Sequence, residues 1–206
     1  IEADELIVNK SLNYVNRLLQ GIYKTYLNDI NYIQKEHVNL KLELEANSDK
    51  IAVFTDSLRF KQVLNNLVSN AIKFTDNGEV VIGYKQINQG GRKLLRFYIK
   101  DTGIGIPDER LDLIFNRFNQ LVDDRKKSYK GTGLGLSISK KLVDLLGSQL
   151  DVDSEEGIGS EFYFSLPYQI LDDADTEIDE KSVRVAKIDW TGKTILVVED
   201  TPSNYY

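Results

Sequence analysis

The chain of 206 residues contains no cysteine, and this absence removes several kinds of chemistry. Without thiols the protein has no disulfide, no thiolate nucleophile and no zinc site built on cysteine. This composition fits a reducing compartment. Long apolar runs are absent as well, so no segment is predicted to span a bilayer, and no signal peptide opens the chain. We expect a cytoplasmic domain that makes no membrane contact of its own.

An excess of positive charge is also missing. The chain has 26 lysine and arginine residues against 32 aspartate and glutamate residues, which gives a formal net charge of −6. A nucleic-acid-binding protein needs a basic face for its phosphate contacts, so the balance argues against that class. A local basic cluster can still hold a phosphate ligand. A length of 206 residues predicts one full domain with a good core and some additional chain, and a hydrophobic content of 41% is ordinary for a soluble globular protein.

Apolar spacing predicts a mixed succession of helices and strands. Ser11 is expected to cap a long amphipathic helix that continues to Ile33. Further helices are predicted at 56–75, 108–114 and 137–146, the last ending at Gly147, and strands at 39–45, 51–55, 79–87, 93–100, 149–154 and 160–166. Because some strands are joined by hairpins and others by helices, we expect an α+β fold with a mixed, mostly antiparallel sheet and helices on one face.

The stretch from Asp56 to Thr75 organises the chain. Asp56 can cap a helix, and the apolar residues that follow recur at helical spacing: Phe60, Leu64, Leu67, Val68, Ala71 and Ile72. The opposite face carries polar residues three or four positions apart: Arg59, Gln62, Asn66, Asn70 and Lys73. Asparagine is a poor helix former, but its amide oxygen suits a hard cation, and a lysine suits phosphate. The alternative interpretation is an ordinary solvated face.

Two glycine motifs follow that helix. In DTGIGIP, residues 101–107, an aspartate closes a strand and two glycines let the backbone approach a flat ligand closely. A carboxylate there would accept a hydrogen bond from the amino group of adenine and repel the carbonyl oxygen of guanine. In GTGLGLS, residues 131–137, a glycine-rich turn leads into a helix, which suits phosphate. Each motif alone also occurs in ordinary turns, and neither is a Walker loop or a dinucleotide fingerprint.

Taken in this order, the motifs resemble the four boxes of the ATP-binding catalytic domain of two-component sensor histidine kinases, within the GHKL ATPase superfamily and its Bergerat-type α/β sandwich. The N box resembles 59–75, the G1 box 101–107, the F box 114–118 and the G2 box 131–137, and GIGSEFYFSLP at 157–167 resembles the closing strand pair. The final residues, TILVVEDTPSNYY, resemble the opening of a receiver domain. We therefore expect a piece of a hybrid kinase, with the catalytic domain at 1–168, an acidic linker at 169–192 and a truncated receiver start at 193–206.

The resemblance implies ATP and Mg²⁺ as ligands and assigns roles by motif. Asn66 and Asn70 would be catalytic, with Asn70 coordinating Mg²⁺ and Asn66 supporting it. Asp101 would read the adenine amino group, and Ser160 would lie near the base through water. The other implied contacts are Lys73 to phosphate, Phe74 to ribose or base, Gly103, Gly105 and Ile106 to the base, and Lys130, Gly131, Thr132, Gly133, Leu134, Gly135 and Leu136 to the phosphates. The charged segment 119–130, with Arg125, Lys126 and Lys127, would form a lid.

The implied reaction is phosphoryl transfer to a histidine outside this chain. Hydrolysing relatives place a glutamate where Asn66 stands, and its absence fits transfer to an imidazole. His37, the only histidine, leads into a strand and lacks the sequence context of an acceptor. The implied partners are an upstream dimerisation hairpin and a downstream receiver domain. The implied parent is a homodimer, with a membrane-bound sensor as one alternative, and this piece itself is expected to be monomeric. A hydrolytic ATPase and a degenerate docking module are the alternatives.

Overall fold

The structure is a computed structural model that describes residues 8–32, 35, 37–45, 49–116, 118 and 133–171. Its helices are α1 (Val15–Tyr32), α2 (Ser57–Phe74), α3 (Asp108–Leu111) and α4 (Gly135–Leu146). Its strands are β1 (Ser11–Tyr14), β2 (Val38–Glu43), β3 (Ile51–Thr55), β4 (Gly78–Gln89), β5 (Arg92–Asp101), β6 (Asp151–Glu155) and β7 (Gly159–Ile170). Within these ranges no helix has both the length and the apolarity that a membrane crossing requires.

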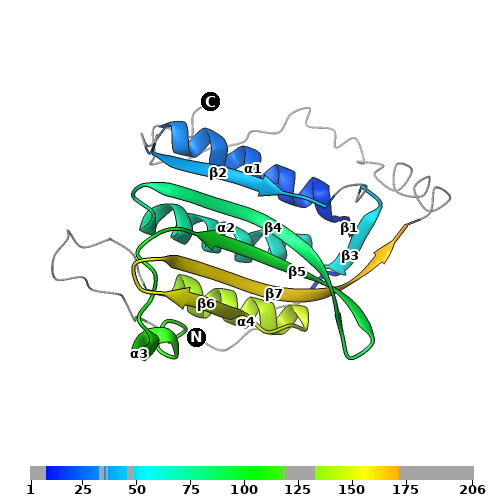
Figure 1. The fold of residues 1–206 in the computed structure, drawn as a ribbon. Coiled ribbons are helices and arrows are strands. Elements are labelled where there is room, and N and C mark those ends of the chain that lie inside the picture. The colour runs from blue at the N-terminus through cyan, green and yellow to red at the C-terminus, as the bar shows by residue number, and fades with distance from the viewer. Residues whose placement is uncertain are drawn as a thin grey trace, which may run out of the picture. The chain divides into compact units, whose positions relative to one another are not determined.

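All seven strands form one sheet, in the order β1-β3-β7-β5-β4-β2, with β6 paired to β7. Only β2 and β4 run parallel; the other pairs are antiparallel. The helices α1, α2 and α4 lie on one face of the sheet (Figure 1). The predicted fold class, a mixed and mostly antiparallel sheet covered on one face, is therefore confirmed.

Helix α2 begins as the sequence predicts. The Asp56 side chain accepts hydrogen bonds at 3.0 Å from the backbone nitrogens of Leu58 and Arg59, so the predicted cap is confirmed. The same carboxylate accepts a third bond from the Asn9 nitrogen at 2.9 Å. Every residue of the predicted apolar stripe is buried, together with Val63.

The predicted start of the first helix at Ser11 is wrong. Residues 11–14 form β1, which pairs antiparallel with β3 in the register Ser11↔Thr55. The strand satisfies backbone groups that a free helical turn would leave to solvent, and this long-range pairing outweighs the local helical pattern. The helix begins at Val15, and its apolar side buries Val15, Leu19 and Ile22.

The predicted hairpins are present, but the ends of their strands differ from the predicted ones. Strands β4 and β5 are joined at Gly90 and Gly91, whose φ values of 59° and 79° suit a tight hairpin turn. Strand β7 continues to Ile170, beyond the expected domain boundary at 168, because its end pairs with β3 and the Leu171 nitrogen bonds the Lys50 carbonyl at 2.9 Å. The predicted linker and receiver start lie otherwise outside the described residues.

Three phenylalanines form the centre of the core between α2 and the sheet. The ring of Phe60 on α2 meets Phe97 on β5 edge to face, with centroids 4.9 Å apart. Phe97 stacks on Phe164 of β7 at 5.5 Å. All three rings are fully buried, so they fix α2 against the middle of the sheet.

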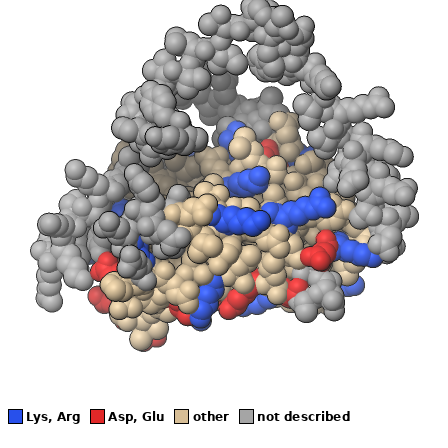
Figure 2. All heavy atoms as spheres, turned by 90° about the horizontal axis from the view of Figure 1, so that it is seen from above, with Lys and Arg blue, Asp and Glu red and all other residues tan. Residues whose placement is uncertain are grey.

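Surface charge is unevenly distributed despite the net negative balance. Basic side chains gather towards the centre of the face drawn in Figure 2, and acidic ones lie mostly towards its margins. The net negative charge of the chain therefore does not describe the centre of this face.

Candidate functional site

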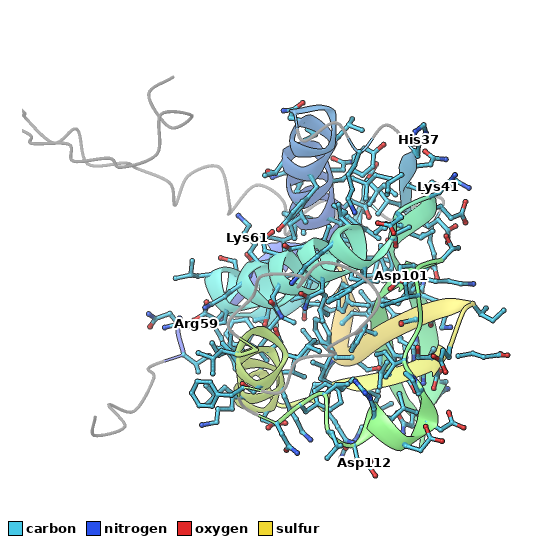
Figure 3. All side chains as sticks on the ribbon, turned by 90° about the vertical axis from the view of Figure 1, so that its left-hand side faces the viewer. His37, Lys41, Arg59, Lys61, Asp101 and Asp112 are labelled. Atoms are coloured by element: carbon cyan, nitrogen blue, oxygen red, sulfur yellow. The ribbon has the colours of Figure 1, made fainter. Side chains whose placement is uncertain are left out.

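The predicted site residues gather where the C-terminal end of α2 meets the end of β5. Figure 3 shows Asp101 beyond this end of α2, with Arg59 and Lys61 towards the helix's other end. Arg59 bonds Gln62 at 3.2 Å, and it lies about 21 Å along the axis from Lys73 at 1.5 Å per residue. The first half of the polar face is therefore separate from the site, and only its second half reaches it.

Asp101 is the buried carboxylate of this region. It is the last residue of β5 and only 7% exposed. One carboxylate oxygen accepts a hydrogen bond from the Gly103 nitrogen at 2.9 Å. Burial raises the pKa of Asp101, and the backbone donors of Gly103 and Ser160 offset only part of that rise. The carboxylate can therefore accept a further hydrogen bond in a poorly solvated place.

The loop after Asp101 is clamped between α2 and the β6–β7 hairpin. The Ile104 nitrogen donates to the Phe74 carbonyl at 3.2 Å, and the Gly157 nitrogen donates to the Ile104 carbonyl at 2.8 Å. A Cβ added at Gly103 would lie 2.4 Å from the Phe74 carbonyl oxygen. One added at Gly105, where φ is 65°, would lie 1.9 Å from the Glu155 carbonyl oxygen. Both glycines are thus required by the close approach of protein backbone.

Two serines support the same loop from the sheet. Ser160 on β7 stands opposite Asp101 in the β5–β7 register and is 7% exposed. Its hydroxyl lies 2.9 Å from that of Ser154, which in turn accepts a hydrogen bond from the Ile106 nitrogen at 2.9 Å. The predicted residues Ser160 and Ile106 are therefore both within this cluster, and Ile106 is buried.

Asn66 connects α2 to α4. Its amide nitrogen donates to the Ser139 hydroxyl at 2.8 Å. Its amide oxygen lies against the start of α4, where a Cβ added at Gly135 would be 2.2 Å away. The side chain predicted to support the metal thus already has a docking partner, and Gly135 leaves the space that this contact needs.

Asn70 and Lys73 occupy the next positions on the same face. Both are half-buried, and the Asn70 side chain forms no hydrogen bond with the described residues. The Lys73 ammonium lies 5.0 Å from the centre of the Phe74 ring. The amide oxygen of Asn70 is therefore available to a ligand at the mouth of the site.

Helix α4 has no side-chain cap, because the residue at its N-cap position is Leu134. Its first turn carries no acidic residue, so the free backbone N–H groups and the positive end of the helix dipole suit an anion. Gly133 precedes the helix with φ at 66°. The predicted residues Lys130, Gly131 and Thr132 lie outside the described part of the chain, as does the predicted lid at 119–130.

The predicted F box packs beside α4. Phe115 packs on the core, and the Lys140 ammonium lies 4.9 Å from the centre of its ring. Phe118 has φ at 62°, which a non-glycine residue adopts only when neighbouring contacts require it. Its nitrogen donates to the Gly133 carbonyl at 3.1 Å. This bond ties together the two described residues that flank 119–132.

His37 is closer to the site than its place in the sequence suggests. It precedes β2, and its carbonyl accepts a hydrogen bond from the Gly78 nitrogen at the start of β4. Because β4 lies between β2 and β5, His37 and Asp101 share one end of the sheet. They are two strands apart and offset by about three residues in register, which together correspond to about 14 Å. Figure 3 shows them well separated, and the His37 side chain is exposed.

Sequence reasoning missed three residues that shape the site. Ser139 and Ser154 hold Asn66 and Ile106, and Lys35 binds the end of α2. Their partners lie between 37 and 73 positions away along the chain. No local pattern marks a serine or lysine for such a contact, so the sequence offered no means of finding them.

Comparison with known proteins gives a family match over this same region. Residues 55–170 match the family described as "Histidine kinase-, DNA gyrase B-, and HSP90-like ATPase". This range contains α2, the loop after Asp101, α4 and the closing hairpin.

Curated relatives are sensor kinases. The chain is 33% identical over 181 residues, 86% of its length, to the aerobic respiration control sensor protein ArcB of Escherichia coli. It is 30% identical over 204 residues, 97% of its length, to the autoinducer 2 sensor kinase/phosphatase LuxQ of Vibrio vulnificus. It is 39% identical over 151 residues, 71% of its length, to hybrid signal transduction histidine kinase B of Dictyostelium discoideum. The chain spans only 22%, 23% and 8% of these relatives.

Solved structures show the same fold. Full-length ShkA in complex with AMPPNP has a TM-score of 0.66 at 26% identity, over 81% of this chain and 32% of that one. The nucleotide-free catalytic domain of the histidine kinase ThkA has a TM-score of 0.62 at 29% identity, over 77% of this chain and 95% of that one.

Proposed function

Because the chain belongs to the histidine kinase-, DNA gyrase B- and HSP90-like ATPase family, we propose that its described domain is the ATP-binding catalytic domain of a sensor histidine kinase. It transfers the γ-phosphate of Mg²⁺-ATP to a histidine on a dimerisation domain elsewhere in the full-length protein.

The observation that carries this proposal is Asp101. A carboxylate held at the base of a glycine-lined loop, 7% exposed and with a raised pKa, is costly unless a ligand uses it. As a hydrogen-bond acceptor it pairs with the amino group of adenine. It repels guanine, whose carbonyl oxygen stands at the equivalent position. The glycines let this loop pack closely against α2 and the β6–β7 hairpin, and this packing holds the segment after Asp101 in place.

The residues present fit Mg²⁺ bound together with a triphosphate. Asn70 offers one amide oxygen, and the described residues contain no cluster of three acidic, histidine or cysteine side chains that would hold a metal alone. This matches the usual mode of Mg²⁺, which takes one or two protein ligands and completes its shell with phosphate oxygens and water. When bound, the ion neutralises charge on the phosphates. Lys73 and the uncapped start of α4 are the groups we assign to the same phosphates.

The domain's own contribution to transfer is positioning and charge neutralisation. The bond between the γ-phosphorus and the bridging oxygen of ADP breaks, and a bond between that phosphorus and an imidazole nitrogen forms. Asn66, bound to Ser139, occupies the position where hydrolytic relatives carry a glutamate, so no carboxylate here activates water. This favours transfer over hydrolysis.

We further propose that the parent is a hybrid kinase with a receiver domain after residue 192. The tail at 193–206 supports this through its resemblance to the start of a receiver domain. One relative is named a hybrid kinase, and ThkA has been solved in complex with the response regulator TrrA.

Calorimetric titration of the 206-residue chain with ATP and GTP, with and without Mg²⁺, tests the proposal. We expect ATP to bind and GTP to bind far more weakly. Equal affinities would reject the role of Asp101, and the absence of any ATP binding would favour a docking module. Rapid release of phosphate from ATP would instead favour the hydrolytic alternative.

A further inference from the structure

Lys35, in the turn before β2, binds the C-terminal end of α2. Its ammonium donates to the carbonyls of Ile72 at 2.8 Å, Lys73 at 3.2 Å and Thr75 at 2.9 Å. The nearest carboxylate oxygen, on Asp76, is 3.9 Å away. All three donors of the ammonium are thus directed at the backbone of a single helical turn.

This arrangement replaces the usual end of a helix. The last carbonyls of a helix have no partner within it, and α4 solves this with the left-handed Gly147, whose nitrogen bonds back to that helix. Helix α2 ends instead at Thr75, which is extended (φ −106°, ψ 112°) and fully buried. The positive charge of Lys35 also interacts favourably with the negative end of the helix dipole. Lys35 therefore does for α2 what a glycine cap does for α4.

The capped turn carries site residues. Lys73 has its own carbonyl bound by Lys35, and the next carbonyl, on Phe74, holds the Ile104 nitrogen. The loop after Asp101 has independent supports on its other side, from Gly157 and Ser154. Loss of the Lys35 contacts should therefore change the direction in which Lys73 leaves α2, and it should affect the loop after Asp101 less.

We propose that Lys35 is a positioning residue that fixes the last turn of α2 so that Lys73 reaches the triphosphate. This inference rests on the proposed function, and in particular on the assignment of Lys73 to phosphate. It gives the turn between α1 and β2, which none of the four motifs includes, a role in nucleotide binding.

Replacing Lys35 by methionine tests the inference, because methionine keeps an unbranched apolar stem and removes the charge. We expect Lys35→Met to weaken ATP binding about tenfold, while adenosine, which lacks phosphates, binds within about twofold of the wild type. The matched control is Lys41→Met. Lys41 lies on neighbouring β2, half-exposed and paired with Glu79, and its loss is expected to leave both affinities unchanged.

A double-mutant cycle with Lys73→Ala separates positioning from a general loss of structure. If Lys35 acts through Lys73, adding Lys35→Met to Lys73→Ala costs ATP no further affinity. Equal loss of ATP and adenosine binding, or a full additional loss in the double variant, would overturn the inference. Should Lys35→Met fail to fold, Lys35→Gln provides the same comparison. A wild type that binds no ATP would reject the proposed function itself. ATP binding that Lys73→Ala leaves unchanged would reject the assignment of Lys73 to phosphate and this inference, but not the proposal that the domain binds ATP.

Discussion

Asp101 combines two environments that act on its protonation in opposite directions. Burial disfavours the charged form, while the backbone nitrogens of Gly103 and Ser160 favour it, and burial prevails, so the pKa is raised. An empty site therefore holds a carboxylate at some cost in stability. A ligand that donates a hydrogen bond to it recovers part of that cost.

Asp101→Asn should weaken ATP binding at least tenfold, because a charge-assisted hydrogen bond contributes about 1.5–3 kcal/mol. Asparagine has nearly the same shape and still accepts the Gly103 bond, so the fold should persist. Calorimetric titration measures the change. Asp112→Asn, an exposed aspartate remote from Asp101 in Figure 3, is the control and should bind ATP normally. An unaltered affinity in Asp101→Asn would remove this residue from adenine recognition.

The same substitution should stabilise the nucleotide-free protein at neutral pH. A folded pKa raised above the usual 3.8 means that the folded state binds the proton more tightly than the unfolded state. Stability is therefore lost as pH rises from the unfolded value through the folded one, and the loss persists at pH 7. We expect Asp101→Asn to melt at a higher temperature than the wild type at pH 7, with a difference that shrinks as pH falls through the raised folded pKa towards about 4. A lower melting temperature at pH 7 would contradict the direction of this pKa shift.

At the scale of elements, the loop at residues 101–107 is rigid because backbone meets backbone on both sides. Gly105→Ala should therefore destabilise the fold strongly. The left-handed conformation alone costs an alanine about 1–2 kcal/mol, and the Glu155 carbonyl must also move. Urea denaturation gives the free energy of unfolding.

Gly21→Ala is the matched control for that prediction. Gly21 lies within α1, and a Cβ added there meets nothing within 4 Å. Alanine is the better helix former by about 1 kcal/mol, so this variant should be slightly more stable than the wild type. Similar effects of the two substitutions would show that close packing at Gly105 does not govern stability.

The elements that the sequence predicted well are those with a local cause. Helix α2 combines the Asp56 cap with a continuous apolar stripe, and the β4–β5 hairpin has its paired glycines, so both could be placed closely. Residues 11–14 could not, because their strand exists only through pairing with β3. The same holds within the site: motifs identify Asp101 and Gly105, whereas Lys35 and Ser139 depend on contacts that only the folded chain brings about.

At the scale of the whole molecule, the sheet brings distant segments to one end. The starts of β2 and β4 and the end of β5 lie side by side there, since β2 runs parallel to β4 and β5 antiparallel to it. The connection from β2 to β4 therefore places His37 two strands from Asp101, although the two residues are 64 positions apart in the sequence. A parallel neighbour such as β2 cannot be recognised from local spacing, so the sequence alone does not reveal that these segments share one end of the sheet.

The nearness of His37 makes self-phosphorylation a test of the whole assignment of roles. Transfer needs a nitrogen in line with the γ-phosphorus, and His37 is the only imidazole in the chain. Its main chain is held by Gly78 at the edge of the sheet, about 14 Å from Asp101 by strand spacing and register. We expect that the 206-residue chain, although it binds ATP, acquires no label from γ-labelled ATP. Adding the proposed dimerisation hairpin should produce label on the histidine of that hairpin.

His37→Ala decides between the possible acceptors. In the hairpin assay this variant should transfer as well as the wild type. His37 is exposed and is not among the residues assigned to the phosphates, so it has no part in positioning ATP. Label that appears on the chain alone and disappears in His37→Ala would make His37 the acceptor and overturn the assignment. Label on neither protein, with ATP binding intact, would mean that the domain holds nucleotide without transferring phosphate, and the docking alternative would then be preferred.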